Sequence, residues 1–551
     1  MKLSPKRIAL IALVLVGFAC ATLIQNFSWN QSSHYALIRS LDERDSAVID
    51  PFILTTGDRA YYKGHWYSSR APGLALFSLP WYRGLVDIGM RQWAYNSPAL
   101  RNDDEMIWAV GLWGNVLPGL ILLLIVWRLA EVLEPGYGAT TALTLGLATM
   151  ILPFSTLLFS HLFTACLGMA AFWLLFRERA GPPRLWPLAV AGALIGYAIA
   201  SEYPLLFVGL VIGIYALARG DTRRPVALLA RAGTYTAGAI VGVLPMLFYN
   251  HMAFGSYTHI AYADLPRHQS GFFGIGTPSL STLATLLFTS RGLLTLTPIL
   301  LMGAVGLWLL WQRGRRAETS VIVAICVIFL TYNSGYFLPF GGGVPQPRFL
   351  ITMVPFLALP LGLSYRRFPG PTIALAAISA TSMLIATVIH PSIGYDRETV
   401  IWTRLLGQGN FQPTIASAYG AGRGWAAIMT FLVPIAAAVV LVAAVTPRMR
   451  LSGRSLAAGA AVVVVWGAFA IFGPYALGID SAALHRIYDV SHKIAVLTSP
   501  YPVRPLTRLV PIAMVAALAA LGLSRLLRNQ AASGALDAAS GPKSESARAG
   551  A

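Results

Sequence analysis

Long apolar runs recur along this chain and constrain its fold more than any other feature. Runs of about 17–25 residues, poor in ionisable side chains, return along most of the sequence, and each can cross a bilayer as a helix. The chain is 56% hydrophobic and 11% charged, whereas a soluble domain carries about 25% charged residues. We therefore predict an all-α polytopic membrane protein with about 12–14 transmembrane helices.

The expected spans follow the apolar runs. The first run, residues 8–24, could pass for a signal peptide, but many spans follow it, so we interpret it as a retained first helix. The spans are placed at about 8–25, 107–130, 137–156, 160–176, 185–200, 204–218, 233–251, 296–311, 319–333, 349–364, 371–389, 426–445, 456–474 and 509–524.

The net charge of +19 is distributed as a topology signal. With the N-terminus cytoplasmic, most of the positive excess falls in the short inside loops, as the positive-inside rule expects. These loops hold the basic clusters Arg223 and Arg224; Arg313, Arg315 and Arg316; Arg366 and Arg367; and Arg448, Arg450 and Arg454. Both termini are then cytoplasmic, the long loops face outward, and no nucleic-acid partner is expected.

Loop length divides the chain into regions. Residues 1–25 form the first span, 26–106 a long extracytoplasmic loop, 107–390 a transmembrane core, and 391–525 further spans with outer loops. The tail, residues 526–551, is small and polar, and we predict that it is disordered and cytoplasmic. Long loops usually carry function, so we expect any chemistry on the extracytoplasmic face.

The first outer loop has structure of its own. Helical spacing of apolar residues in "SSHYALIRSLDERD", residues 32–45, predicts a helix with Ser32 or Ser33 as its N-cap. "APGLALFSLPWYRGLVDIG", residues 71–89, is too short and too interrupted to span, and it predicts a helix lying in the membrane interface. Between them, "AYYKGHWYSSR" is expected to be an ordered turn. The segment 278–288 is a candidate for re-entry into the membrane.

Several polar residues on this face are candidates for chemistry. Five acids of the first loop are either a solvated acidic face or the source of a general base, and they permit a divalent cation without requiring one. Arg70 is either a snorkelling arginine or a bidentate ligand for a phosphate. The acids are Asp42, Glu43, Asp45, Asp50 and Asp58.

Other candidates are each weak alone. His65, Tyr62 and Tyr67 are interfacial belt residues or substrate contacts. Glu202 and His161 lie at two outer turns, where an acid near membrane depth suggests function, and Asn250 and Arg348 lie at the outer ends of later spans. The cysteines Cys20, Cys166 and Cys326 fall in expected spans without metal-ligand spacing, so we predict buried free thiols and no metal site.

The pattern resembles the GT-C superfamily of membrane glycosyltransferases, which includes protein O-mannosyltransferases and bacterial lipid A aminoarabinose transferases. The resemblance rests on "TGDRAYYKGHWYSSRAPGLALFSLP" at 56–80, "YN" and "FGS" at 249–256, "TSRGLLTLTPILL" at 289–301 and "PRFLITMVPFLALP" at 347–360. It covers residues 25–391 and makes 107–390 a GT-C-like core.

The resemblance implies inverting transfer of a hexose or pentose from a polyprenyl-phosphate carrier to an envelope glycan, lipid or protein, at the outer face of a bacterial inner membrane. It implies that Arg70 and Arg348 contact the carrier phosphate and that an acid is the base. The family's acid after the first span is absent at 30–34, so Asp58 and Asp50, then Asp42, are the preferred substitutes. A lipid-linked saccharide flippase and a non-catalytic membrane assembly subunit are the alternatives.

Overall fold

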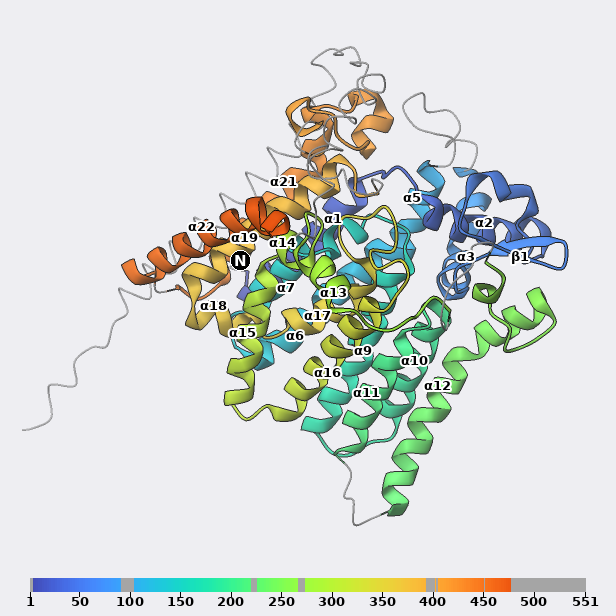
Figure 1. The fold of residues 1–551 in the computed structure, drawn as a ribbon, viewed down its shortest axis with the longest axis horizontal. Coiled ribbons are helices and arrows are strands. Elements are labelled where there is room, and N and C mark those ends of the chain that lie inside the picture. Colours follow the sequence, from blue (N-terminus) through green and yellow to red (C-terminus); the bar gives the residue numbers. More distant parts are fainter. Residues whose placement is uncertain are drawn as a thin grey trace, which may run out of the picture.

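The computed structural model describes residues 3–90, 104–219, 225–265, 273–392, 402, 405–449 and 451–476. These residues are almost entirely helical, and the prediction of an all-α polytopic membrane protein is confirmed for them (Figure 1). The expected span 509–524, the predicted disordered tail 526–551 and the arginines at 223, 224 and 450 lie outside the described residues.

Eight helices of the described residues are long and apolar enough to cross a membrane, and two bent pairs raise that number to ten. Three shorter apolar helices, α7 (Gly138–Leu147), α10 (Trp186–Ser201) and α11 (Leu205–Leu217), occupy further expected spans. The long ones are α1 (Pro5–Thr22), α5 with α6 (Glu105–Leu133), α9 (Ser160–Ala180), α12 (Pro225–Phe254), α16 (Arg316–Ser334), α19 (Pro369–Ile389), α21 (Trp425–Val445) and α22 (Gly453–Ala476).

Several expected spans are interrupted rather than straight. The run 137–156 ends as α7 and resumes as α8 (Ile151–Phe154), where the Thr149 hydroxyl accepts a hydrogen bond from the Ile151 N–H. The run 349–364 is η4 (Arg348–Met353), α17 (Val354–Ala358) and α18 (Leu361–Arg367), bent by 54° near Pro360, which lacks an N–H for the helix ladder. These breaks correct the prediction of continuous helices there.

The segment predicted to re-enter the membrane is a bent element. Helices α13 (Leu280–Phe288) and α14 (Leu293–Leu296) meet α15 (Ile299–Gln312) at 85°. This geometry is that of a broken span or a re-entrant loop, so re-entry into the membrane stays a prediction.

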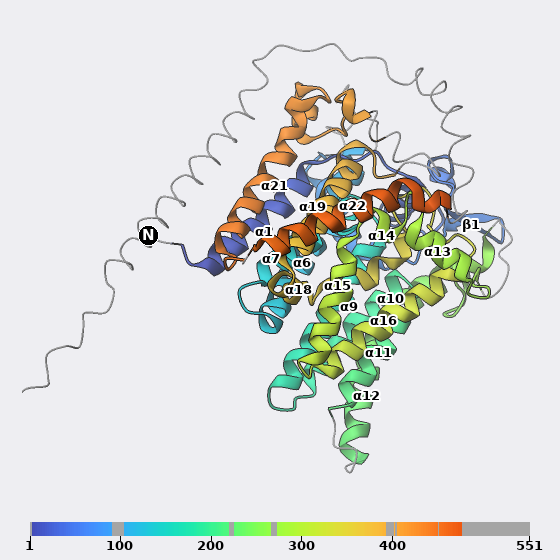
Figure 2. The same ribbon diagram turned by 60° about the vertical axis from the view of Figure 1, so that its left-hand side comes forward.

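Close packing of α10 on α12 fixes one side of the bundle (Figures 1 and 2). Gly192 and Gly196 of α10 face Gly238 and Gly242 of α12, and a Cβ at any of them would lie within 2.2 Å of a backbone oxygen of the facing helix. Small residues four apart on both helices allow backbones to approach, as is common between membrane helices. The contact fixes the position of α10, including its last residue, Ser201.

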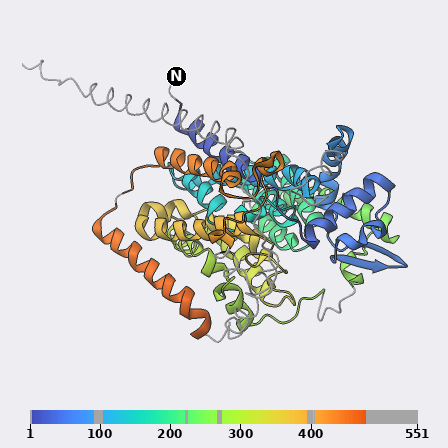
Figure 3. The same cartoon turned by 90° about the horizontal axis from the view of Figure 1, so that it is seen from above.

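The first outer loop forms a compact unit at one end of the bundle, and Figure 3 shows it at the edge remote from α22. It contains α2 (Trp29–Arg44), η1 (Asp50–Thr55), strands β1 (Arg59–Tyr62) and β2 (His65–Ser68), and α3 (Gly73–Asp87). Both predicted helices are present, but the predicted N-cap is wrong: α2 begins after Ser28, and Ser32 and Ser33 lie inside the helix. The interfacial position of α3 stays a prediction.

The expected turn is a two-stranded antiparallel hairpin, an element that the all-α prediction did not include. Lys63 and Gly64 both have positive φ, at 45° and 91°, which is the requirement of a two-residue turn that matches strand twist. Aromatic residues on either side favour strands.

Candidate functional site

A tight contact carries the end of the hairpin onto the membrane bundle. Gly73, the first residue of α3, lies against the last turn of α10, where a Cβ would stand 2.2 Å from the Ser201 Oγ. The Tyr197 hydroxyl donates to the Gly73 carbonyl at 2.9 Å. Arg70 lies three residues earlier, so this contact places its side chain beside Glu202, the residue that follows α10.

Arg70 is anchored by the loop that also supplies its acid. Its Nη2 lies 2.6 Å from Asp58 Oδ2, and its backbone N–H donates to Ser68 Oγ at 3.2 Å. The Ser33 hydroxyl of α2 donates to the Asp58 carbonyl at 2.6 Å and lies 2.9 Å from Ser68 Oγ. The hairpin and α2 therefore hold the Arg70–Asp58 ion pair in one geometry.

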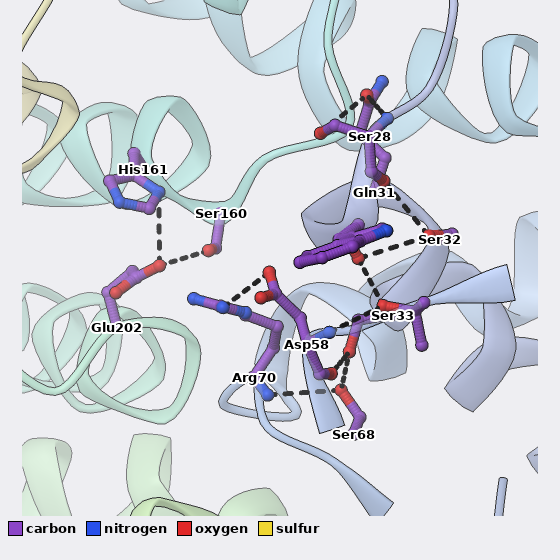
Figure 4. A network of polar contacts seen from close by, with 12 residues as sticks. Ser28, Gln31, Ser32, Ser33, Asp58, Ser68, Arg70, Ser160, His161 and Glu202 are labelled. Atoms are coloured by element: carbon purple, nitrogen blue, oxygen red, sulfur yellow. Dashed lines mark hydrogen bonds and ion pairs between the residues drawn. The ribbon is translucent and has the colours of Figure 1, made fainter. Parts of the chain in front are cut away.

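Glu202 and His161 form a second pair facing Arg70. The Ser160 hydroxyl donates to the Glu202 carboxylate, and His161 Nδ1 lies 3.2 Å from Glu202 Oε1 without the geometry of a hydrogen bond. Figure 4 shows the Arg70 guanidinium extending between the Asp58 side and the Glu202 side of this group. Ser160 and His161 begin α9, so three segments distant in sequence meet here.

Arg348 adds a second guanidinium from η4. It is 6% exposed, its Cζ lies 5.4 Å from the Phe159 ring centroid, and its Nε has no hydrogen-bond partner among the described residues. Gly341, at φ 77°, packs on its side chain so closely that a Cβ would stand 2.5 Å from Nε. We call Asp58, Arg70, His161, Glu202 and Arg348 the Arg70 cluster.

Burial and charge set the protonation of this cluster. Burial lowers the pKa of Arg70, but Asp58, followed by Tyr262, Glu202 and Tyr336, outweighs it and raises that pKa overall, so the guanidinium stays charged. Burial raises the pKa of Glu202 more than the Ser160 hydrogen bond, Arg70 and Arg348 together lower it. Because its pKa is raised, the negative charge of Glu202 is less favourable than that of an exposed carboxylate, which favours an additional anionic ligand beside the two guanidinium groups.

Sequence reasoning missed two buried residues one turn apart on α2, of which His34 is acted on electrostatically by Arg70 and Arg348. Asn30 and His34 are 2% and 0% exposed, and no atom of the Asn30 amide or of the His34 ring nitrogens has a hydrogen-bond partner in the described part of the chain. Burial and the charges of Arg70 and Arg348 lower the pKa of His34 to about 3. A signal existed, since His34, Leu37 and Leu41 share one helix face.

Two tyrosines were missed as well. Tyr262 and Tyr336 both act electrostatically on Arg70, although they lie in separate loops. Burial is the main cause that raises the pKa of each hydroxyl, so both stay neutral and able to donate. No spacing in the sequence relates them to residue 70.

The structure does not bring the other predicted acids to Arg70. Asp42 Oδ1 pairs with Arg83 Nε at 2.6 Å, and Asp50 accepts from the Trp66 N–H at 2.7 Å and lies 2.8 Å from His65 Nδ1. Their catalytic role stays a prediction without support from proximity. Among the described residues no group of three or more His, Cys, Asp or Glu side chains is arranged to hold a metal ion.

The predicted aromatic and amide contacts serve packing. Tyr62 and Tyr67 lie 5.5 Å and 5.0 Å, centroid to centroid, from Phe254 at the end of α12, and Asn250 Nδ2 donates to the Tyr257 carbonyl at 3.2 Å. These contacts fasten the hairpin to α12. The thiols of Cys20, Cys166 and Cys326 are free, as predicted.

A small, water-sized pocket lies beside α2, and no residue of the Arg70 cluster lines it. Residues from the end of α1, from α5 and from the turn before α9 line it, among them Leu23, Gln25, Gln31, Trp108 and Thr156. Neither Arg70 nor Glu202 reaches it, so we do not include it in the site.

Comparison with known proteins finds no matching family model and no matching curated protein sequence. Among solved structures, the chain is similar to ArnT from Cupriavidus metallidurans bound to undecaprenyl phosphate, at 15% identity over 91% of this chain and 83% of that one, with a TM-score of 0.48. It is also similar to the apo oligosaccharyltransferase of Archaeoglobus fulgidus, at 11% identity over 81% and 57%, with a TM-score of 0.39.

Both matched proteins belong to the superfamily that the sequence resembles. At these identities and scores the likeness is one of helix arrangement, and it assigns no role to any residue of this chain.

Proposed function

We propose that this protein is an integral membrane glycosyltransferase that moves a sugar from a polyprenyl-phosphate carrier to an acceptor hydroxyl on the extracytoplasmic face, with inversion. The observation that carries the proposal is the Arg70 cluster, in which Arg70 and the buried Arg348 interact near the start of α9 and the end of α10, beside α3. The function is the one implied by the sequence resemblance, and the cluster supplies its chemistry.

The charge of the cluster suits a phosphate leaving group. In such a transfer the phosphodiester of the carrier gains negative charge as the bond to the sugar breaks. Guanidinium groups fixed in a buried site stabilise that charge without having to reorganise. Asp58 holds Arg70 in position, and Arg348 has a buried Nε free to donate.

The position of α3 suits a lipid-borne donor. This helix carries Trp81 and Tyr82 after Pro80 and docks at its first residue on α10. A helix lying in the interface places its N-terminal neighbour, Arg70, at the depth of lipid headgroups. The phosphate of a carrier that diffuses in the bilayer reaches the cluster at the same depth.

The remaining assignments complete the proposal. Glu202 and His161 lie across from Arg70 and contact the sugar or the acceptor, and the basic loops place both termini in the cytoplasm of a bacterial inner membrane. The acceptor is a hydroxyl of an envelope glycan, lipid or protein.

A direct assay tests the proposal. Purified protein is incubated in proteoliposomes with a panel of radiolabelled polyprenyl-phosphate hexoses and pentoses and with envelope extract as acceptor. We expect label to move from one donor into a hydrophilic or lipid-linked product. If no donor is consumed while labelled lipid moves between leaflets, the protein is a flippase and the proposal fails.

A further inference from the structure

His34 is a buried histidine with nothing to bind in the described structure. Its side chain is fully buried on the inner face of α2, and neither ring nitrogen has a hydrogen-bond partner among the described residues. An unsatisfied buried polar group costs about 1–3 kcal/mol, so such groups call for an explanation. Asn30, one turn earlier on the same face, is buried and unsatisfied in the same way.

The surroundings of His34 keep it neutral. The charged groups that act on it are Arg70 from the hairpin side and Arg348 from η4, and it in turn acts on His161 of α9. Two guanidinium groups and burial disfavour an imidazolium. A neutral imidazole has one N–H donor and one nitrogen lone pair that accepts a proton.

The carboxylates nearby are already engaged. Asp58 is bound to Arg70 at 2.6 Å, so a proton placed on it would weaken the contact that positions the phosphate ligand. Glu202 accepts from Ser160 and lies against His161. Neither ring nitrogen of His34 has a hydrogen-bond partner among the described residues, so protonation there breaks no contact. The ring nitrogens of His161 have no hydrogen bond either, but its Nδ1 already lies 3.2 Å from Glu202 Oε1.

We propose that His34 is a catalytic residue that takes the proton of the acceptor hydroxyl, and that Asn30 binds the same acceptor or the sugar. The inference rests on the proposed function. The acceptor oxygen forms a bond to the anomeric carbon, the bond from that carbon to the phosphate oxygen breaks, and polyprenyl phosphate leaves with the electron pair. The hydroxyl proton goes to the lone pair of a His34 ring nitrogen.

Donor binding makes this base stronger. A phosphodiester bound by Arg70 and Arg348 offsets the positive charge that disfavours protonated His34. The imidazole therefore accepts a proton more readily when the donor is present than when the site is empty. In the empty site His34 is a weak base, so the reaction is not promoted before the donor binds.

Three variants test the assignment in the full-length protein with the donor found in the panel assay. We expect His34→Gln, which keeps the size and polarity but not the basicity, to lower kcat by about 100-fold or more while the donor KM changes by less than threefold. His34→Ala should show the same loss, and added imidazole should restore part of its rate. His251→Ala, which removes an exposed histidine of α12, is the matched control and should keep its activity.

The outcomes separate this inference from the proposed function. If the unchanged protein transfers sugar and His34→Gln does so within threefold of it, His34 is not the base and the inference is wrong, although the proposed function stands. If His34→Ala unfolds, the kcat and donor KM of His34→Gln decide whether His34 is the base. Suppose that His34→Gln is folded by its melting curve and slow, and that added imidazole does not restore the rate of His34→Ala. His34 then has a structural role, and the inference is wrong. If the unchanged protein transfers nothing from any donor, both proposals fail together.

Discussion

Two groups of buried charge in this protein have opposite characters. In the first, which we call the Glu134 cluster, the carboxylate of Glu134 is 1% exposed and each of its oxygens lies 2.5 Å from an arginine, Arg313 or Arg366. In the second, the Arg70 cluster, ion pairs stand beside buried nitrogens that have no partner in the described structure.

The difference distinguishes a structural ion-pair cluster from a candidate ligand-binding site. Arg313 and Arg366 belong to two of the basic loops that the positive-inside rule placed together, and Glu134 ties these loops with both of its oxygens in use. Because both oxygens of Glu134 are bound by arginines, this cluster has no unsatisfied carboxylate oxygen in the described structure with which to bind a ligand. The Arg70 cluster keeps donors unsatisfied at a cost in stability, which is typical of sites that bind or react.

The largest effect is expected for Arg70→Ala. We expect sugar transfer to fall by about 1,000-fold, because a fixed donor to the departing phosphate is lost. Transfer of radiolabel from the active donor is the measurement. Arg83→Ala, which removes an exposed arginine of α3, is the control and should stay active. Near-normal transfer by Arg70→Ala would show that the unsatisfied cluster is not the site.

Asp58→Asn should act through Arg70 and so be milder. A hydrogen bond between charged groups contributes about 1.5–3 kcal/mol, so we expect transfer to fall by roughly 10-fold to 100-fold. The donor KM should rise, since the arginine is less well held. A double variant with Arg70→Ala should be no slower than Arg70→Ala alone, and additive losses would contradict the positioning role.

The pH dependence of stability tests the neutral state of His34. Its pKa is about 3 in the folded protein and about 6.5 in an unfolded chain. The unfolded state therefore binds the additional proton between these values, so stability is fully present above pH 6.5 and is lost as the pH falls toward 3, by up to about 1.4 kcal/mol per pH unit. Melting curves in detergent should show His34→Gln losing less stability than the unchanged protein between pH 6.5 and pH 4. Parallel curves would contradict the assignment.

Glu134→Gln should affect folding and leave chemistry intact. Removing the charge from a buried group that holds two arginines destabilises the fold, and because both arginines are partly exposed we expect a loss of about 2 kcal/mol. Thermal unfolding in detergent measures it. The rate of transfer per folded molecule should not change, and a large loss of rate would erase the distinction between the two clusters.

Arg366→Ala is the smallest expected effect. Its side chain is 63% exposed, and exposed pairs contribute about 0–1 kcal/mol. We expect a melting temperature close to that of the unchanged protein, because Arg313 still binds Glu134. A loss as large as that of Glu134→Gln would show that the two arginines act as one unit.

Much of this architecture could be predicted because its signals are local. Apolar runs, Pro-Gly breaks and the helical spacing of residues 32–45 placed most helices of the described structure. The hairpin was missed although its signal was present, since Lys63-Gly64 between aromatic runs is a turn pattern. We gave the polar character of "YYKGHWYS" more weight than its turn chemistry.

The site could be predicted only in part, because proximity across the fold leaves no mark in local sequence. Arg70, Asp58, Arg348, Glu202 and His161 were each candidates, and the structure brings these five together. Asp50 was preferred as the base together with Asp58, Asp42 came next, and His65 was a candidate contact; all three pair with other residues of the first loop instead.

The sequence by itself determined that this chain is a helical membrane protein, because hydropathy acts residue by residue. Its charge pattern predicts that the basic loops lie on one face and the long loops on the other. Only the tertiary structure decided which polar residues work together. Gly73 must touch α10 for Arg70 to reach Glu202, and α2 must fold inward for His34 to be buried beside two arginines. Burial of this kind is a property of packed helices. In the sequence His34 is an ordinary helix residue, and its burial in the fold makes it the strongest candidate for the base.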